Sequence, residues 1–266
     1  MQAHPTTIWG WFQFSKGDHR GGPRSAFFKS LSQLSCDQFL DLIKRAARDS
    51  RQGNLRPLAK LREEGRRNVP SLDQLLEELK NPKNRRERHL QYLLWHRGHL
   101  LTPYQRMIAR EVPCSFRKVK RPSVTDFLVI DDLRRVPLIV EVKCGTAKDS
   151  LTGVLLELLV QWCFYKSAME AFRQQLQDDG EQIDQNMTQP EAAIVAPIGF
   201  YRKALERSNS RKRHGEAVNA LRFLRILKTA FDLRVCFIVL SNDWHLQGTK
   251  LRCHQLRTNV IDNATT

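Results

Sequence analysis

The stretch TDFLVIDDLRRVPLIVEVK, residues 125–143, decides the fold of this 266-residue chain. It holds two apolar runs separated by a charged turn at residues 131–137. In the first run, Asp126, Leu128 and Ile130 fall on one face of an extended chain, and Phe127 and Val129 fall on the other. The pattern therefore predicts two neighbouring β-strands joined by a short connection.

Three charged residues interrupt these apolar strands. Glu141 and Lys143 are two residues apart and share a strand face, and a hairpin-like connection would place Asp126 beside Glu141. Paired carboxylates suit Mg²⁺ or Mn²⁺, which polarise a phosphoryl oxygen and lower the pKa of water. Lys143 can position or deprotonate the attacking water, or stabilise charge that develops on the phosphate. A structural ion pair is the alternative, although burying such charges without a partner or metal is costly.

The flanking sequence predicts a regular order of elements. Helical or strand periodicity marks helices at 85–96, 152–176 and 216–231, and strands at 105–112, 125–130, 138–143, 192–197 and 233–240. The order α-β-β-β-α-β-α-β predicts an α/β architecture, with a mixed central sheet flanked by helices.

Domain boundaries follow from composition. Residues 1–80 form a basic, aromatic-containing N-terminal accessory region, helical from about residue 35, with Ser71 as a helix N-cap. The core is expected at 81–245, followed by a C-terminal tail at 246–266. Trp9, Trp11 and Phe12 would either anchor the N-terminus on the core or dock a partner.

The charge is strongly asymmetric. The formal net charge is +16, and residues 1–125 contain 25 Lys and Arg against 11 Asp and Glu. Such an excess predicts a polyanionic partner, because cations that neutralise phosphates release counterions. DNA is the expected partner, an anionic membrane is far less favoured, and a solvated basic surface is the alternative.

Other features bear on the class of protein. No apolar run approaches the roughly 20 residues of a membrane span, and residues 1–15 do not resemble a signal peptide. The six cysteines form no C-x-x-C pair and have no zinc-finger spacing to histidine. They are predicted to be reduced core residues, and the protein to be cytoplasmic.

Two further positions extend the candidate site. On the predicted helix at 152–176, Gln161 and Tyr165 are one turn apart, with Glu157 one turn earlier on the same face. A polar stripe on an apolar helix indicates an active site or DNA contact, or else a satisfied polar edge. Upstream, Glu87 would add a carboxylate on the metal side, or is an ordinary solvated residue.

With these residues in place, the chain resembles the PD-(D/E)XK nuclease superfamily over about residues 85–240. Asp126 matches the first acid of the motif, Glu141 the second and Lys143 its lysine. Gln161 and Tyr165 match the Gln-x-x-x-Tyr motif of the RecB-like branch, and Glu87 matches the acid of the first core helix. Thr125 replaces the name-giving proline, and the run from Thr125 is similar to end-cleaving nucleases of some transposons.

The resemblance implies a restriction-endonuclease-like α-β-β-β-α-β core. It also implies a Mg²⁺- or Mn²⁺-dependent DNA nuclease, with an endonuclease favoured over an exonuclease. Asp126, Glu141 and Glu87 would bind metal, Asp126, Glu141 and Lys143 would be catalytic, and Gln161 and Tyr165 would support the site or bind substrate. Transposition, recombination, repair or phage defence would fit, within a nucleoprotein complex. The alternatives are an inactive nucleic-acid-binding or assembly subunit with this fold, and a structural RNA-binding protein.

Overall fold

The computed structural model describes residues 57–114, 123–144, 151–186, 189–205, 220–221, 223–229 and 231–256. Most of the accessory region lies outside these residues, including Trp9, Trp11 and Phe12. The elements named below all belong to the described part of the chain.

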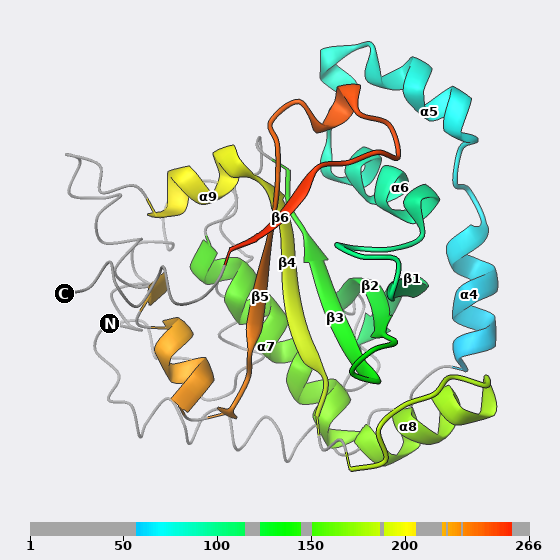
Figure 1. Cartoon of the computed structure of the whole chain (residues 1–266), viewed down its shortest axis with the longest axis vertical. Coiled ribbons are helices and arrows are strands. Elements are labelled where there is room, and N and C mark those ends of the chain that lie inside the picture. Colours follow the sequence, from blue (N-terminus) through cyan, green and yellow to red (C-terminus); the bar gives the residue numbers. More distant parts are fainter. Residues whose placement is uncertain are drawn as a thin grey trace, which may run out of the picture.

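A single six-stranded sheet forms the centre of the molecule, and its spatial order follows the chain order (Figure 1). The first three strands are antiparallel, β3, β4 and β5 are parallel, and β6 is antiparallel to β5. The strands are β1 (Gln105–Cys114), β2 (Ser123–Asp131), β3 (Val136–Val142), β4 (Glu191–Pro197), β5 (Val235–Leu240) and β6 (Cys253–Leu256). The mixed sheet predicted from the sequence is confirmed.

Helices cover both faces of this sheet. Their bounds are α4 (Leu58–Arg66), α5 (Leu72–Leu79), η2 (Pro82–Asn84), α6 (Glu87–Arg97), α7 (Leu151–Ser167), α8 (Met169–Asp178), α9 (Ile198–Leu205) and η3 (Trp244–Leu246). One buried apolar cluster joins α4, α7, α8 and α9 to the sheet, and a second joins α5, α6 and η3 to the opposite face. Among the helices described, none has both the length and the apolar character needed to cross a bilayer.

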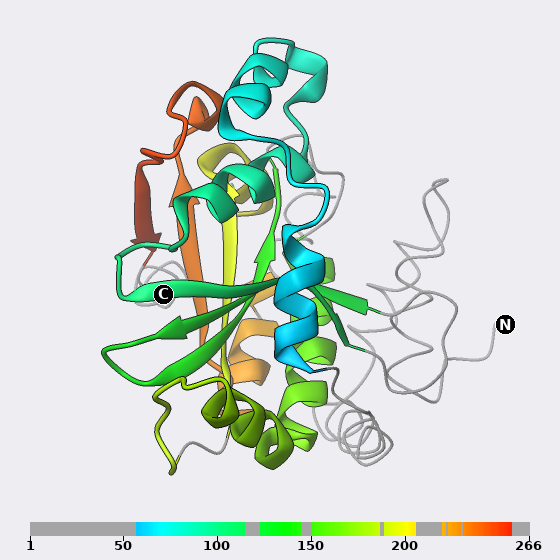
Figure 2. The ribbon, with the colours of Figure 1, turned by 90° about the vertical axis from the view of Figure 1, so that its right-hand side faces the viewer.

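The two faces follow the predicted alternation in β2. Leu128 and Ile130 belong to the cluster on the α7 face, whereas Phe127 and Val129 belong to the cluster on the α6 face. Figure 2 shows that the sheet is strongly twisted, because β1 and β2 run across the direction of β4 and β5. Helix α4 packs on β1 at one edge of the sheet, whereas α9 packs on β4 and β5 towards the other edge.

The prediction of a single helix over residues 152–176 is wrong. The structure has two helices, because the α-helical conformation is interrupted at Ala168, where φ is −107° and ψ is 20°. No glycine or proline marks this break in the sequence. The new direction lets Met169, Phe172 and Leu176 of α8 pack into the core, so tertiary packing explains the interruption.

Besides the short helices η2 and η3, two elements were not predicted. Helix α9 follows β4 directly, and β6 lies within the segment assigned to the C-terminal tail. The sheet therefore extends past the predicted core boundary at residue 245. The four residues of β6 are too few and too polar to be distinguished from a loop without their partner β5. Of the helix predicted at 216–231, residues 220–221, 223–229 and 231 are described, and all are helical.

The described end of the accessory region packs against the core. Ser71 caps α5 as predicted: Gln74 N donates to Ser71 Oγ at 3.3 Å, and Ser71 N donates to Gln74 Oε1 at 3.0 Å. On α4, Leu58 and Leu61 are buried in the α7-side cluster. The described residues 57–80 of the accessory region thus contribute directly to both apolar clusters.

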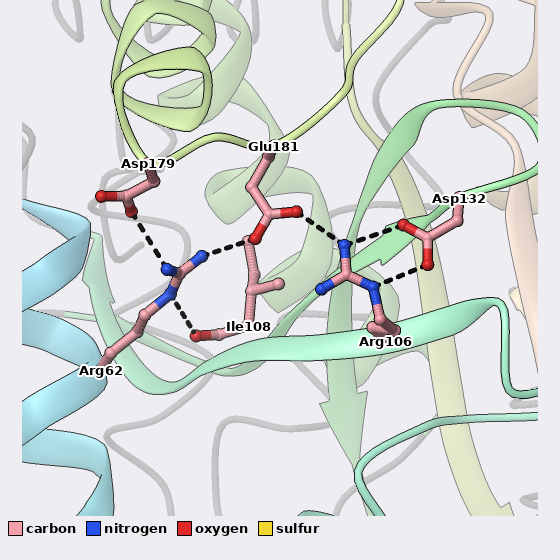
Figure 3. Close-up of polar contacts among 6 residues, drawn as sticks. All are labelled: Arg62, Arg106, Ile108, Asp132, Asp179 and Glu181. Atoms are coloured by element: carbon pink, nitrogen blue, oxygen red, sulfur yellow. Dashed lines mark hydrogen bonds and ion pairs between the residues drawn. The ribbon is translucent and has the colours of Figure 1, made fainter.

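A polar network fixes α4 to the sheet (Figure 3). Arg62 Nη2 of α4 and Arg106 Nη2 of β1 each donate to the Glu181 carboxylate at 2.7 Å. Arg106 also donates to both oxygens of Asp132, at 2.6 and 2.9 Å, and Arg62 lies 3.6 Å from Asp179. Two arginines and three acids thereby join α4, β1, the β2–β3 turn and the end of α8.

Candidate active site

The antiparallel pairing of β2 and β3 brings Asp126 to the predicted pair. Phe127 pairs with Val140 across the two antiparallel strands, so the preceding residue, Asp126, lies opposite Glu141. The Val142 backbone N–H donates to Asp126 Oδ2 at 2.7 Å. Asp126 is only 8% exposed, and Glu141 and Lys143 are 3% and 4% exposed. The strand pair therefore holds two carboxylates and an ammonium group in the protein interior.

The Lys143 ammonium lies among carboxylates from three elements. Its Nζ donates to Glu141 Oε1 at 2.7 Å, and it lies 3.7 Å from Glu87 Oε1 and 3.9 Å from Glu157 Oε2. Glu87 is the first residue of α6, which contacts β3, and Glu157 projects from α7. Together with Asp126, whose charge also acts on Lys143, four carboxylates surround this ammonium.

Gln161 links the cluster to α7. Its Nε2 donates to Glu141 Oε2 at 3.1 Å and to the Val124 carbonyl at 3.2 Å. The first bond orients the Glu141 carboxylate, and the second attaches the same amide to β2. Gln161 Oε1 is buried and has no hydrogen-bond partner among the described residues, so a further donor can be accepted there.

Tyr165 lies one turn further along α7 and is 1% exposed. Its ring packs against Phe164 and Phe172, with centroid distances of 5.5 and 4.9 Å. The contacts described for Tyr165 are thus aromatic contacts in the core. Its predicted role in supporting the site or binding substrate stays a prediction.

Burial and mutual repulsion control the protonation of the acids. Burial is the main cause that raises the pKa of Asp126 to about 7, against the attraction of Lys143, and the charge of Glu87 raises it further. Burial and the charge of Asp126 raise the pKa of Glu141 well above its ordinary value. Burial alone would lower the pKa of Lys143, but the surrounding carboxylates raise it, so this lysine remains an ammonium ion.

Glu157 was not predicted to bind metal. The sequence indicated only that it lies on the same helix face as Gln161. The available signal was a carboxylate in a helix whose described neighbours are mostly buried and apolar. Only the packing of α7 against β3 shows that this carboxylate approaches Lys143.

The donor chemistry of the cluster fits a hard divalent cation. Carboxylate oxygens are the protein ligands that Mg²⁺ and Mn²⁺ prefer. Within the described ranges, no three Asp, Glu, His or Cys side chains already converge as a metal site, and the Lys143 ammonium lies among the acids instead. Binding a metal would therefore require some of these carboxylates to reorient.

Comparisons with known proteins add no assignment. No family model matches this chain, and no curated protein or solved structure gives a significant match.

Proposed function

We propose that this protein is a metal-dependent DNA nuclease that hydrolyses phosphodiester bonds, and that it acts as an endonuclease. The observation that carries this proposal is the burial of Asp126 and Glu141 beside the Lys143 ammonium, with Glu87 and Glu157 at 3.7 and 3.9 Å from the same ammonium. The order of α6, β1, β2, β3, α7 and β4 supports the finer proposal of a restriction-endonuclease-like core.

The burial of two acids beside one ammonium argues against a purely structural ion pair. Asp126 and Glu141 are both buried, and holding both of them ionised is costly when Lys143 supplies a single positive charge. Burial is the main cause that raises the pKa values of both acids, and the charges of neighbouring acids raise them further. A divalent cation would supply positive charge and release the protons that the two acids otherwise retain.

The residues would divide the chemistry as follows. Asp126 and Glu141 would hold Mg²⁺ or Mn²⁺, with Glu87 and Glu157 as the nearest additional carboxylates. A bound ion would polarise the phosphate and lower the pKa of the attacking water. Lys143, which carries a raised pKa, would stabilise the charge that develops on the phosphate rather than serve as a base. Gln161 would hold the Glu141 carboxylate in position.

The test is cleavage of supercoiled circular, linear and single-stranded DNA with Mg²⁺, Mn²⁺ or EDTA. We expect nicking of the circle only with metal, and a loss of at least a hundredfold in Asp126→Asn and Lys143→Met. Glu170→Gln is the matched control, because Glu170 is an exposed acid of α8.

Three results would contradict the proposal. Cleavage that persists in Asp126→Asn and Lys143→Met would exclude this site, and cleavage of linear DNA alone would exclude an endonuclease. Tight DNA binding without cleavage under any condition would favour the alternative of an inactive binding or assembly subunit.

A further inference from the structure

A run of cations lies directly beside the carboxylate cluster. Residues 83–88 read Lys-Asn-Arg-Arg-Glu-Arg, and we define the basic tract as Lys83, Arg85, Arg86 and Arg88. Lys83, Arg86 and Arg88 are exposed, and Arg85 is half-buried. The only acid in the run, Glu87, lies 3.7 Å from the Lys143 ammonium. The segment that brings a carboxylate to the site therefore also carries four cations to its edge.

The four cations of the basic tract lie close together in the chain and are not neutralised by acids. Across the described residues, no ion pair joins a carboxylate to any of them. Three other arginines, in contrast, are each neutralised by two acids: Arg62 by Asp179 and Glu181, Arg106 by Asp132 and Glu181, and Arg134 by Asp131 and Glu191. The positive charge at residues 83–88 is thus available to a ligand.

Backbone contacts hold two of these side chains in place. Arg85 Nε donates to the Leu79 carbonyl at 3.3 Å, and Arg86 Nε donates to the Lys83 carbonyl at 3.1 Å. Each bond uses only the Nε hydrogen, so the Nη groups of both side chains can still donate to a ligand. A guanidinium oriented in this way loses less conformational entropy when it binds a phosphate.

The basic tract also lies close to the η3 segment. Burial is the main cause that lowers the pKa of His245, which belongs to η3, and the charge of Arg85 lowers it further. The segment that contains η3, orange-red in Figure 1, lies beside α5.

We infer that the basic tract binds the phosphate backbone of duplex DNA and guides the strand across the carboxylate cluster. This inference rests on the proposed nuclease function, and it assigns the position of the substrate on the protein. Duplex DNA carries one negative charge per about 1.7 Å of helix axis, so four adjacent cations suit a short run of phosphates. Such contacts position the duplex without reading its sequence.

The test is the salt dependence of DNA binding by the full chain, measured by fluorescence anisotropy with a duplex of about 20 base pairs in EDTA. The tract variant is Arg85→Gln/Arg86→Gln/Arg88→Gln. Its matched control is Lys60→Gln/Arg66→Gln/Arg67→Gln, three exposed cations at α4. Both lower the formal net charge of +16 by three.

We expect the tract variant to lower the slope of log K against log salt by about 2 to 3, since each lost phosphate contact contributes about 0.9. Its affinity in 50 mM salt should fall at least tenfold, and the slope of the control should change by less than about 1. A second variant keeps the three charges: Arg85→Lys/Arg86→Lys/Arg88→Lys. It should keep most of the slope, and it therefore distinguishes an effect of lost charge from an effect of disturbed structure.

The outcomes separate this inference from the proposed function. Equal losses in both Gln variants, or unchanged binding by the tract variant, would overturn the tract even if the wild type cleaves DNA. A selective loss of binding in the tract variant, with no cleavage by the wild type, would support the tract and reject the nuclease. Tighter binding of duplex RNA than of DNA would overturn DNA as the ligand.

Discussion

Lys143 is the residue on which the site depends electrostatically. Its ammonium is surrounded by Glu141, Glu87 and Glu157 and also attracts Asp126. Burial opposes its charge, yet the acids keep it protonated. The site therefore requires a cation at this position when no metal is bound.

The first prediction concerns Lys143→Met. Removing the ammonium leaves Asp126 and Glu141 buried without its positive charge, so we expect the metal-free protein to lose about 3–5 kcal/mol of unfolding free energy. Urea unfolding in EDTA measures this loss. Lys166→Met, at an exposed lysine of α7, should lose far less. Equal losses in the two variants would contradict the proposed electrostatic role.

The second prediction concerns Asp126→Asn and pH. The Asp126 pKa rises from 3.8 to about 7 on folding, so the folded state binds more protons between these values. Stability of the metal-free wild type should therefore fall as pH rises from about 4 to about 7. Asparagine removes the charge and its oxygen can still accept from Val142 N. We expect the variant to be more stable by on the order of 2 kcal/mol at pH 8.

Urea unfolding of both proteins at pH 5 and pH 8 in EDTA measures this effect. The advantage of Asp126→Asn should be larger at pH 8 than at pH 5. An advantage that is equal at both values, or that grows towards acid, would show that Asp126 does not have a raised pKa.

At the scale of elements, the most consequential contact is the attachment of α4. Glu181 is a nearly buried acceptor for both Arg62 and Arg106, and so it joins α4 to β1 through the segment after α8 (Figure 3). Arg62 also donates to the Ile108 carbonyl at 3.1 Å. A nearby pocket of about 280 Å³ includes Arg66 and Trp95 in its lining. Arg62 and Arg106 also line this pocket, and both are already neutralised by acids, unlike the arginines of the basic tract.

The third prediction is that Glu181→Gln weakens this attachment. Glutamine keeps the size but not the charge, so both arginines lose a charge-assisted bond and the protein should lose about 1–3 kcal/mol. Urea unfolding gives the global loss, and limited proteolysis should show faster cleavage within α4. Glu170→Gln is the matched control. A proteolysis rate at α4 that equals the wild-type rate would contradict the role of the network.

At the scale of the whole molecule, the sheet brings four elements to one site. Asp126 comes from β2, Glu141 from β3, Glu87 from α6 and Glu157 from α7, and Lys143 directly follows β3. The basic tract enters the same region because it precedes and begins α6. The proposed metal and the proposed DNA path would therefore meet where the helices of both faces approach the end of β3.

The fourth prediction is that Mg²⁺ stabilises the whole chain. A ligand that binds only the folded state raises its stability, by about 2.7 kcal/mol at a hundred times its Kd. We expect the Tm to rise as Mg²⁺ is added, and not in Asp126→Asn/Glu141→Gln. NaCl at equal ionic strength controls for screening. An equal rise of Tm in the double variant would place the bound metal elsewhere.

Local sequence determined much of this architecture. Apolar alternation in residues 125–143 predicted β2, β3 and their faces, and the Asp126, Glu141 and Lys143 arrangement followed from the same period of two. Ser71 predicted the start of α5, because a cap depends on residues three apart. These features depend on near neighbours in the chain, and near neighbours are visible in a sequence.

Tertiary structure decided the remainder. The break at Ala168 follows from the packing of α8, and β6 is a strand only because it pairs with β5. The approach of Glu157 and Glu87 to Lys143 joins residues far apart in the chain. The charge balance of the site depends on those distances and on burial, because Coulomb energy depends on separation and solvation rather than on sequence order. The sequence determined which acids and which lysine were available, and the packing of α6 and α7 around β3 decided that Glu87 and Glu157 approach Lys143.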